Sequence, residues 1–489
     1  MEESTQLSTQ TMRRWESQSL AKRLYNASPW YLQNIFVSAY GLVLMRRLTS
    51  PAIKKHLAYY LKTQWLSRED MAELQSKKLQ ALIQHAYQNV PYYRQVFGRL
   101  GLKPEDIRTP ADLEKLPLLG KQEIRQNPDA FFARNMDRQK MNAMATSGTT
   151  GSPLTVYVTS HNAATERALN LRMRHWGGWH PNDKRATLSG YSVVPQGPQK
   201  LPLWRYDLPE HRLFLSPYHM TNENMGKYIE KLRGFQPQII ESYPSYLSFL
   251  ALHLERNNET LPVQAVFTSS ETLFPHQRQI IEERFETRIF DWYGLTERAA
   301  SAAQCELGDG YHVNAEKTII EIVRDDGTVA LPGEYGEIVG TNLEEYGMPL
   351  IRYRSGDMSA LRAEPCPCGR ALPIIEQIQT RVDDIITTSD GRLINPAPLA
   401  GLFRSETIQR GRIVQEEPDR FTVQIVAGDG FSQADATPIV DGVHRVVGSN
   451  VRVAVEVVDA IPCLPNGKYP FVLSKLRNKP KPDRVELTS

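Results

Sequence analysis

The stretch DWYGLTE, residues 291–297, decides the fold, because it joins a short apolar run to a polar turn. The run Arg288–Asp291 predicts a strand, and the polar side chains follow at its carboxyl end. In α/β proteins ligands bind at the carboxyl edge of the parallel strands. We therefore expect Tyr293, Thr296 and Glu297 at that edge, where a tyrosine ring can stack on a purine and a carboxylate can hold Mg²⁺.

The segments around this stretch alternate between strand and helix patterns. Alternation of this kind predicts an α/β fold whose mostly parallel sheet is flanked by helices. Further on, Thr318–Val323 and Tyr335–Thr341 predict a hairpin, which would make the sheet mixed. The alternating segments are Ile239–Ile240, Ser245–Arg256, Val263–Thr268 and Pro275–Phe285.

A chain of 489 residues exceeds the size at which one hydrophobic core stops growing, so we expect two domains. Residues 1–382 are predicted to form the large domain, in which residues 66–135 are helical scaffold. Residues 383–489 are predicted to form a small, mobile α+β domain, with strands at Phe421–Val426 and Val451–Val457.

Composition excludes several classes of protein. A net charge of +3 gives no support for a nucleic-acid binder, and the polar N-terminus carries no secretion signal, so we expect a cytoplasmic protein. Four cysteines do not make a disulfide framework.

The stretch Trp30–Met45 is mostly apolar and is followed by Arg46 and Arg47. It is too short to span a bilayer. We favour a helix packed on the protein's own core or on a partner subunit. Peripheral membrane contact through residues 30–47 is the alternative.

The stretch TSGTTGSP, residues 146–153, combines hydroxyl side chains with glycines. Backbone N–H groups and hydroxyls of such a loop can wrap phosphate oxygens, although the alternative is a surface linker. Two further features carry charge: Asp357 in YRSGD, residues 353–357, and Lys468 in PNGK, residues 465–468. Taken singly, Glu297 could cap a helix, Asp357 could fix a turn and Lys468 could be solvated.

Taken in order, these motifs resemble the AMP-forming superfamily of acyl-CoA synthetases, peptide-synthetase adenylation domains and luciferases, from about Leu66 to Lys468. The resemblance implies ATP or AMP and Mg²⁺ as ligands, with Thr296 and Glu297 near the reacting α-phosphate and Glu297 as the Mg²⁺ ligand. It implies Asp357 as the ribose ligand and Lys468 as the catalytic lysine. The loop implied to grip the leaving phosphates consists of Thr146, Ser147, Gly148, Thr149, Thr150 and Gly151.

The same resemblance implies roles for further residues. Tyr293 and Gly294 match the adenine motif, and Arg381 is implied as a further nucleotide-binding residue. Arg381 and Asp383 match the hinge motif, with Asp383 as the pivot between the domains. Ser269, Ser270 and Glu271, at the end of the Val263 strand, are predicted to line the adenine pocket. Tyr243 and Pro244 are predicted to line the acyl pocket.

Three more stretches resemble one branch, the phenylacetate-CoA ligases and CapK proteins. They are residues 89–94 (NVPYYR), 152–154 (SPL) and 366–370 (CPCGR). The sequence departs from the family at Leu154, where a lysine is common, and at Thr380, where the hinge glycine is expected.

The resemblance implies an enzyme that activates a carboxylic acid with ATP and then transfers the acyl group, normally to the thiol of CoA. One rival is a transferase that passes the acyl group to an amine, hydroxyl or carrier-protein thiol in polysaccharide or secondary-metabolite assembly. Another is a catalytically silent scaffold. Related ligases are often dimers, so a homodimer is a further expectation.

A structural zinc site is predicted from Cys305, His312, Cys366 and Cys368. Three cysteines and one histidine make a usual closed tetrahedral set, and such sets occur in part of the resembling branch. Ordinary buried thiols and a surface histidine are the alternative.

Overall fold

A computed structural model of the chain shows two compact units: unit 1 holds the described residues up to Ile378, and unit 2 those from Ile386. The predicted domain boundary after residue 382 falls outside the described residues. The structure describes residues 20–48, 50–145, 154–191, 193–195, 202–378, 386–389, 393–394, 399, 401–403, 405, 407–462, 469 and 471–476.

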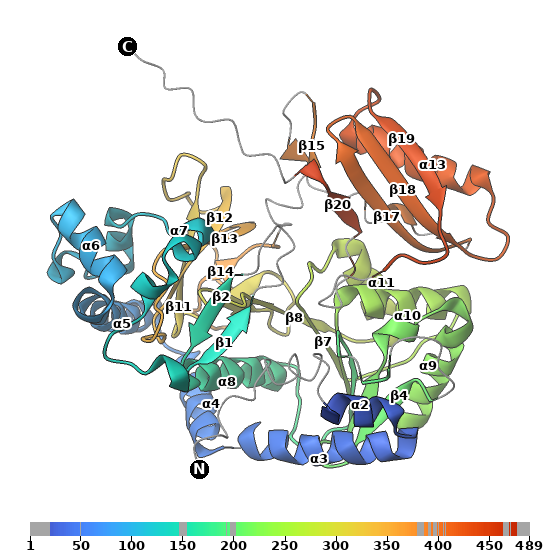
Figure 1. Ribbon diagram of the computed structural model, residues 1–489, viewed down its shortest axis with the longest axis horizontal. Coiled ribbons are helices and arrows are strands. Elements are labelled where there is room, and N and C mark those ends of the chain that lie inside the picture. The colour runs from blue at the N-terminus through green and yellow to red at the C-terminus, as the bar shows by residue number, and fades with distance from the viewer. Residues whose placement is uncertain are drawn as a thin grey trace. The chain divides into compact units, whose positions relative to one another are not determined.

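A nine-stranded sheet in the order β14-β10-β9-β8-β7-β6-β3-β5-β4 organises unit 1 (Figure 1). Strands β5, β3, β6, β7 and β8 are parallel, and the strands beyond them on both sides are antiparallel. The predicted α/β fold with mixed and parallel sheets is therefore confirmed. The strands are β3 Arg185–Leu188, β4 Trp204–Asp207, β5 Arg212–Leu215, β6 Ile239–Ser242, β7 Ala265–Ser269, β8 Ile289–Gly294, β9 Ser301–Ala303, β10 Tyr311–Val313 and β14 Ile374–Ile375.

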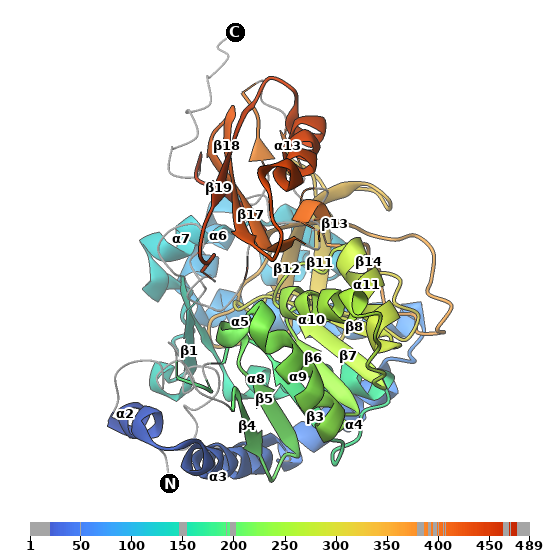
Figure 2. The same ribbon diagram turned by 90° about the vertical axis from the view of Figure 1, so that its right-hand side faces the viewer.

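Helices cover both faces of this sheet (Figure 2). On one face α4 (Pro51–Thr63) and α8 (Ser160–Trp176) pack against apolar side chains of β6, β7 and β8, such as Phe267 and Phe290. On the other lie α9 (Asn222–Phe235), α10 (Pro244–Arg256) and α11 (Pro275–Phe285). Proline opens α4, α10 and α11, where its missing N–H costs no hydrogen bond.

The rest of unit 1 contains two smaller sheets and the predicted helical scaffold. The hairpin of β11 (Thr318–Val323) and β12 (Tyr335–Asn342) forms as predicted, but it pairs with β13 (Tyr353–Ala360) in a separate three-stranded sheet. The large sheet is mixed for another reason, because β9 reverses direction after β8. The other elements are β1 Asn142–Ala145, β2 Thr155–Val158, α5 Arg68–Asn89, α6 Pro91–Leu100 and α7 Lys121–Gln126.

The N-terminal helices are α2 (Leu20–Ala27) and α3 (Trp30–Leu48), and both lie at the outside of unit 1 (Figures 1 and 2). The predicted helix is confirmed, and it packs on the edge strand β4 of the large sheet, but part of its apolar surface is exposed. Tyr31, Ile35 and Val43 are 54%, 61% and 45% exposed. Among the described residues, no helix is long and apolar enough to cross a membrane.

Unit 2 contains a four-stranded sheet in the order β19-β18-β17-β20 and one long helix, α13 (Gln433–Val447). Apolar side chains of the helix, including Ile439 and Val443, form its core with Ile413 and Phe421 of the sheet. The strands are β17 Ile408–Glu417, β18 Arg420–Ala427, β19 Arg452–Val457 and β20 Val472–Ser474, beside the short pair β15 Ile386–Thr387 and β16 Leu393–Ile394.

Candidate active site

Two tyrosines tie the predicted carboxylates to the ends of two strands. Tyr293, at the end of β8, donates a hydrogen bond of 3.0 Å from its hydroxyl to Oδ2 of Asp357 on β13. Both side chains are buried, at 9% and 6% exposure. The backbone N–H of Asp357 donates to Ser355 Oγ at 2.9 Å. Two predicted residues that lie 64 positions apart are thus in direct contact.

Glu297 has two partners that the sequence analysis missed. The Tyr353 hydroxyl donates to Glu297 Oε1 at 2.6 Å, and Lys121 Nζ, at the start of α7, lies 3.7 Å from the same oxygen. Glu297 does not cap a described helix. Thr296, half-buried, occupies the turn just before it. The structure therefore places one cation and one hydroxyl on this carboxylate.

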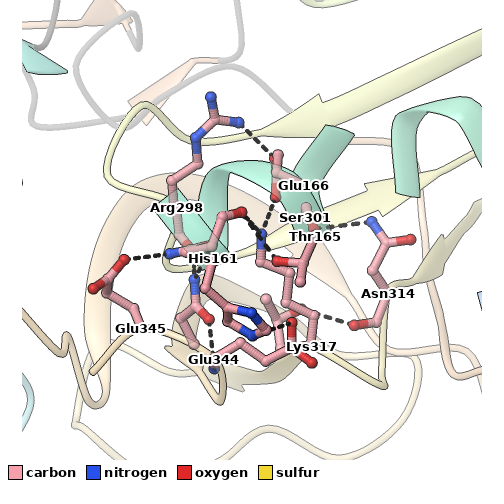
Figure 3. A network of polar contacts seen from close by, with 12 residues as sticks. His161, Thr165, Glu166, Arg298, Ser301, Asn314, Lys317, Glu344 and Glu345 are labelled. Carbon is pink, nitrogen blue, oxygen red and sulfur yellow. Dashed lines mark hydrogen bonds and ion pairs between the residues drawn. The ribbon is translucent and has the colours of Figure 1, made fainter. Parts of the chain in front are cut away.

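Behind this turn lies a buried polar network (Figure 3). Arg298 adopts the left-handed conformation with φ of 61°, and its Nη1 donates to Glu166 Oε1 at 2.7 Å. Glu166 also accepts from Lys317 Nζ at 2.5 Å, and Lys317 is fully buried. Asn342 Nδ2 donates to the Arg298 carbonyl at 2.6 Å. Charged groups on α8 and just before β11, together with the amide of Asn342 on β12, therefore hold the turn.

Burial and neighbouring charges compete in setting the pKa values of the groups in this region. It lowers the pKa of Lys317, against the attraction of Glu166. Burial opposes ionisation of Glu166 as well, but the cations of Lys317 and Arg298 outweigh it, so the pKa of Glu166 is lowered. Beneath Tyr293, burial raises the pKa of Asp291 although Thr268 and Tyr311 donate hydrogen bonds to it.

The predicted acyl-pocket residues lie at the topological switch point of the sheet. The chain leaves β3 toward β5 on one side and returns to β6 on the other, and ligands bind in the crevice at such a point. Tyr243 follows β6, its N–H donates to the Leu188 carbonyl at the end of β3 at 3.2 Å, and Pro244 begins α10. Burial raises the pKa of Tyr243.

The predicted adenine-pocket residues follow β7, the strand between β6 and β8. Ser269 ends the strand, and Ser270 is exposed with a left-handed φ of 74°. Glu271 Oε2 accepts a hydrogen bond of 3.1 Å from the N–H of Ser245, at the start of α10. Gly294 ends β8 one strand away. These residues share one sheet edge, as their positions after parallel strands predicted.

Several predicted residues lie outside the described part of the chain. They are Thr146, Ser147, Gly148, Thr149, Thr150, Gly151, Arg381, Asp383 and Lys468.

A second cluster brings together the four predicted metal ligands. The ligand atoms of Cys305, His312, Cys366 and Cys368 all lie within 4.8 Å of one another. Cys305 follows β9, His312 lies on β10, and the other two cysteines lie between β13 and β14. The histidine is buried, so the alternative of a surface histidine is wrong.

Distances within this cluster fit a tetrahedral zinc ion. Cys305 Sγ and Cys366 Sγ are 3.8 Å apart, and Cys368 Sγ is 3.4 Å from His312 Nε2. Zinc–ligand bonds of about 2.3 Å to sulfur and about 2.0 Å to nitrogen place such pairs about 3.8 and 3.5 Å apart. His312 Nδ1 is buried without a hydrogen-bond partner among the described residues, although a ligating histidine usually has one there.

The thiols of the cluster differ in acidity. Burial raises the pKa of Cys305 to about 12. Burial also opposes ionisation of Cys368, but hydrogen bonds with His312 and Arg370 together outweigh it and lower the pKa of that thiol to about 6.

Comparison with known proteins gives three kinds of match. Residues 386–475 match the family model of the CapK C-terminal domain. Protein CapK of Staphylococcus aureus is 26% identical over 465 residues, which are 93% of this chain and 99% of that protein. The phenylacetate-coenzyme A ligase of Escherichia coli (strain K12) is 32% identical over 341 residues, covering 67% of this chain and 73% of that protein.

Among solved structures, that of 2-hydroxyisobutyryl-CoA ligase in the postadenylation state, in complex with R3-HIB-AMP, matches with a TM-score of 0.66. It covers 85% of this chain and 92% of that chain at 19% sequence identity. At this level of sequence identity, the match shows similarity of fold alone.

Proposed function

The chain belongs to the phenylacetate-coenzyme A ligase family, and from this premise we propose that it activates a carboxylic acid with ATP and transfers the acyl group to the CoA thiol. In the first step the acid's carboxylate oxygen bonds to the α-phosphorus while the bond to pyrophosphate breaks. In the second, the thiol sulfur bonds to the acyl carbon, its proton is lost, and AMP leaves.

The observation that carries this proposal is the contact of Tyr293 with Asp357 beside the contact of Tyr353 with Glu297. These contacts hold Asp357 beside Tyr293 at the carboxyl end of β8, the edge where α/β proteins bind ligands, and Glu297 beside Tyr353 at the start of β13. Asp357 is suited to accept hydrogen bonds from ribose hydroxyls. Glu297 offers the hard oxygen ligand that Mg²⁺ prefers, and bound Mg²⁺ would neutralise phosphate charge.

Residues outside the described part complete the proposal. The loop from Thr146 to Gly151 would hold the departing phosphates through its N–H groups and hydroxyls. Lys468, in a small domain of residues 383–489, would approach the acid and the α-phosphate when that domain closes on residues 1–382. Movement about Asp383, beside Arg381, would then withdraw the lysine and admit the thiol.

Pyrophosphate release with a panel of carboxylic acids tests the proposal. The protein should release pyrophosphate with at least one acid, and CoA should convert that acid to a thioester. Omission of the acid is the control. No release with any acid would favour the non-catalytic scaffold.

A second candidate is an acyl-adenylating transferase with a non-CoA acceptor. The observation that favours it is the CapK match, which extends through residues 386–475 and covers nearly all of CapK. Pyrophosphate release without thioester formation, followed by acyl transfer to an amine, hydroxyl or carrier protein, would support this candidate over CoA transfer.

We further propose that Cys305, His312, Cys366 and Cys368 hold a structural zinc ion. Because Cys366 and Cys368 lie on a loop and His312 on β10, the ion would fasten the loop to the sheet edge. A closed set of four ligands leaves no open position for substrate, which favours stability over catalysis.

Protein purified without chelator should contain about one zinc ion per chain. Cys366→Ser should lower the zinc content and the thermal unfolding midpoint together, since a closed site loses one of its four ligands. Cys463→Ser, which alters the cysteine outside the set, is the matched control and should keep the zinc. Elemental analysis showing clearly less than one zinc in the parent protein would contradict the site.

A further inference from the structure

Helix α3 exposes one stripe of large apolar side chains, whereas Gln33, Asn34 and Ser38 lie on its inner side with half-buried apolar residues such as Val37 and Leu44. Its outer face consists of Tyr31, Leu32, Ile35, Phe36, Leu42 and Val43, all between 38% and 61% exposed. Leu20 and Leu24 on the adjoining α2 are also exposed, at 75% and 58%. Contiguous apolar surface of this kind marks an interaction site in a folded protein.

The inner side of α3 is fixed by hydrogen bonds to the edge strand β4. Asn34 Oδ1 accepts from the Tyr206 N–H at 3.0 Å, and Ser38 Oγ accepts from the Leu208 N–H at 3.1 Å. Gln33 Oε1 accepts from Arg205 Nε at 2.6 Å. The bonds of Asn34 and Ser38 occupy backbone N–H groups in and just after the edge strand that would otherwise be left open, whereas Gln33 bonds to a side chain of the strand.

Gly41 of α3 lies close to Asp207, and this close approach also fixes the orientation of the helix. A Cβ atom at this position would lie 2.0 Å from Asp207 Oδ2, at the end of β4, so a larger residue does not fit without movement. The helix cannot turn its apolar side toward the protein without losing this contact and the hydrogen bonds to β4. The outer face is therefore positioned to contact a partner other than unit 1.

Charge identifies the chemistry of the partner. Residues 17–68 contain eight lysines and arginines and no aspartate or glutamate. Arg23 before the outer face and Arg46 after it are both exposed. A twofold contact between two copies would bring these like charges together, whereas anionic lipid headgroups complement them.

We propose that the outer face of α3 docks on an anionic membrane surface, with the helix axis parallel to the membrane plane. Apolar side chains would enter the boundary between headgroups and acyl chains, and the flanking arginines would contact lipid phosphates. The polar side of the helix keeps its hydrogen bonds to β4, so unit 1 stays folded while bound. This inference does not depend on the reaction proposed above.

Vesicle sedimentation with the full chain tests the proposal. The protein should sediment with vesicles of phosphatidylglycerol and phosphatidylcholine, and raising the salt should weaken binding. The double variant Ile35→Asp/Val43→Asp should bind at least about tenfold more weakly, since two charges would have to enter the apolar layer. Leu331→Asp alters an equally exposed leucine, 63% exposed, away from α3, and should bind like the parent.

Four results would overturn the proposal. The first is failure of the parent protein to bind anionic vesicles, and the second is equal binding by the double variant. The third is a dimer in light scattering that the double variant converts to a monomer, which would make the face a subunit interface. The fourth is a thermal midpoint that falls far more in the double variant than in Leu331→Asp, because the face would then be covered within the chain.

Discussion

Lys468→Ala is expected to slow acyl-adenylate formation by about 100- to 1,000-fold, the usual loss when one preorganised stabilising group is removed. Two anions must meet in this step, and an ammonium group that bridges them acts mainly in the transition state. ATP binding should persist, because Asp357 and Glu297 lie on unit 1. Thioester formation from a supplied acyl-adenylate should also persist, since that half-reaction does not use the lysine.

Pyrophosphate release and thioester formation are measured separately for this variant. Lys475→Ala is the matched control: it removes a lysine of unit 2 that is 55% exposed and paired with Glu416 at 2.8 Å, and both rates should stay at the parent level. Adenylation by Lys468→Ala at near the parent rate would remove this residue from the mechanism. Equal loss in both half-reactions would assign it a structural role.

Lys317→Met is expected to lower the free energy of unfolding of unit 1 by about 3–5 kcal/mol, the usual cost of removing one partner from a buried ion pair. Lys317 is fully buried, and its Nζ lies 2.5 Å from Glu166 Oε2. After the substitution Glu166 keeps only Arg298 as an ionic partner among the described residues. Since Arg298 follows the Glu297 turn, adenylation should also slow.

Urea unfolding followed by tryptophan fluorescence measures this effect, because all seven tryptophans precede residue 378 and report on unit 1. Lys115→Met breaks the exposed pair with Asp112 and should cost less than about 1 kcal/mol. The double variant Lys317→Met/Glu166→Met should recover part of the loss, because no carboxylate is left uncompensated. A Lys317→Met protein as stable as the control would show that the buried pair contributes nothing.

Local patterns were sufficient for much of the fold. Apolar runs with flanking turns predicted β8, β11, β12, β18 and β19, because strand signals depend on neighbouring residues. The same patterns missed β17 and α13 of unit 2. Pro438 lies inside α13 and argues locally against a helix, yet packing of Ile439 and Val443 against the sheet stabilises it.

The orientation of α3, in contrast, could not be predicted from local sequence patterns. Its composition predicts a helix, and amphipathic reasoning favours packing of its apolar residues on the protein's own core or on a partner subunit. Asn34 and Ser38 instead bond to β4, more than 160 residues away, so the apolar side faces outward. No pattern within residues 30–48 contains that information, because the partner strand lies elsewhere in the sequence.

The sequence by itself determined the family, the strand-helix alternation, and the motif residues Tyr293, Glu297 and Asp357. Each of these depends on residue type and short spacing, which a chain displays without folding. Only the tertiary structure decided that Tyr353 and Lys121 contact Glu297 and that Lys317 lies buried against Glu166. These partners lie 56, 176 and 151 positions from the carboxylates they contact, and only the packing of strands and helices brings such positions together.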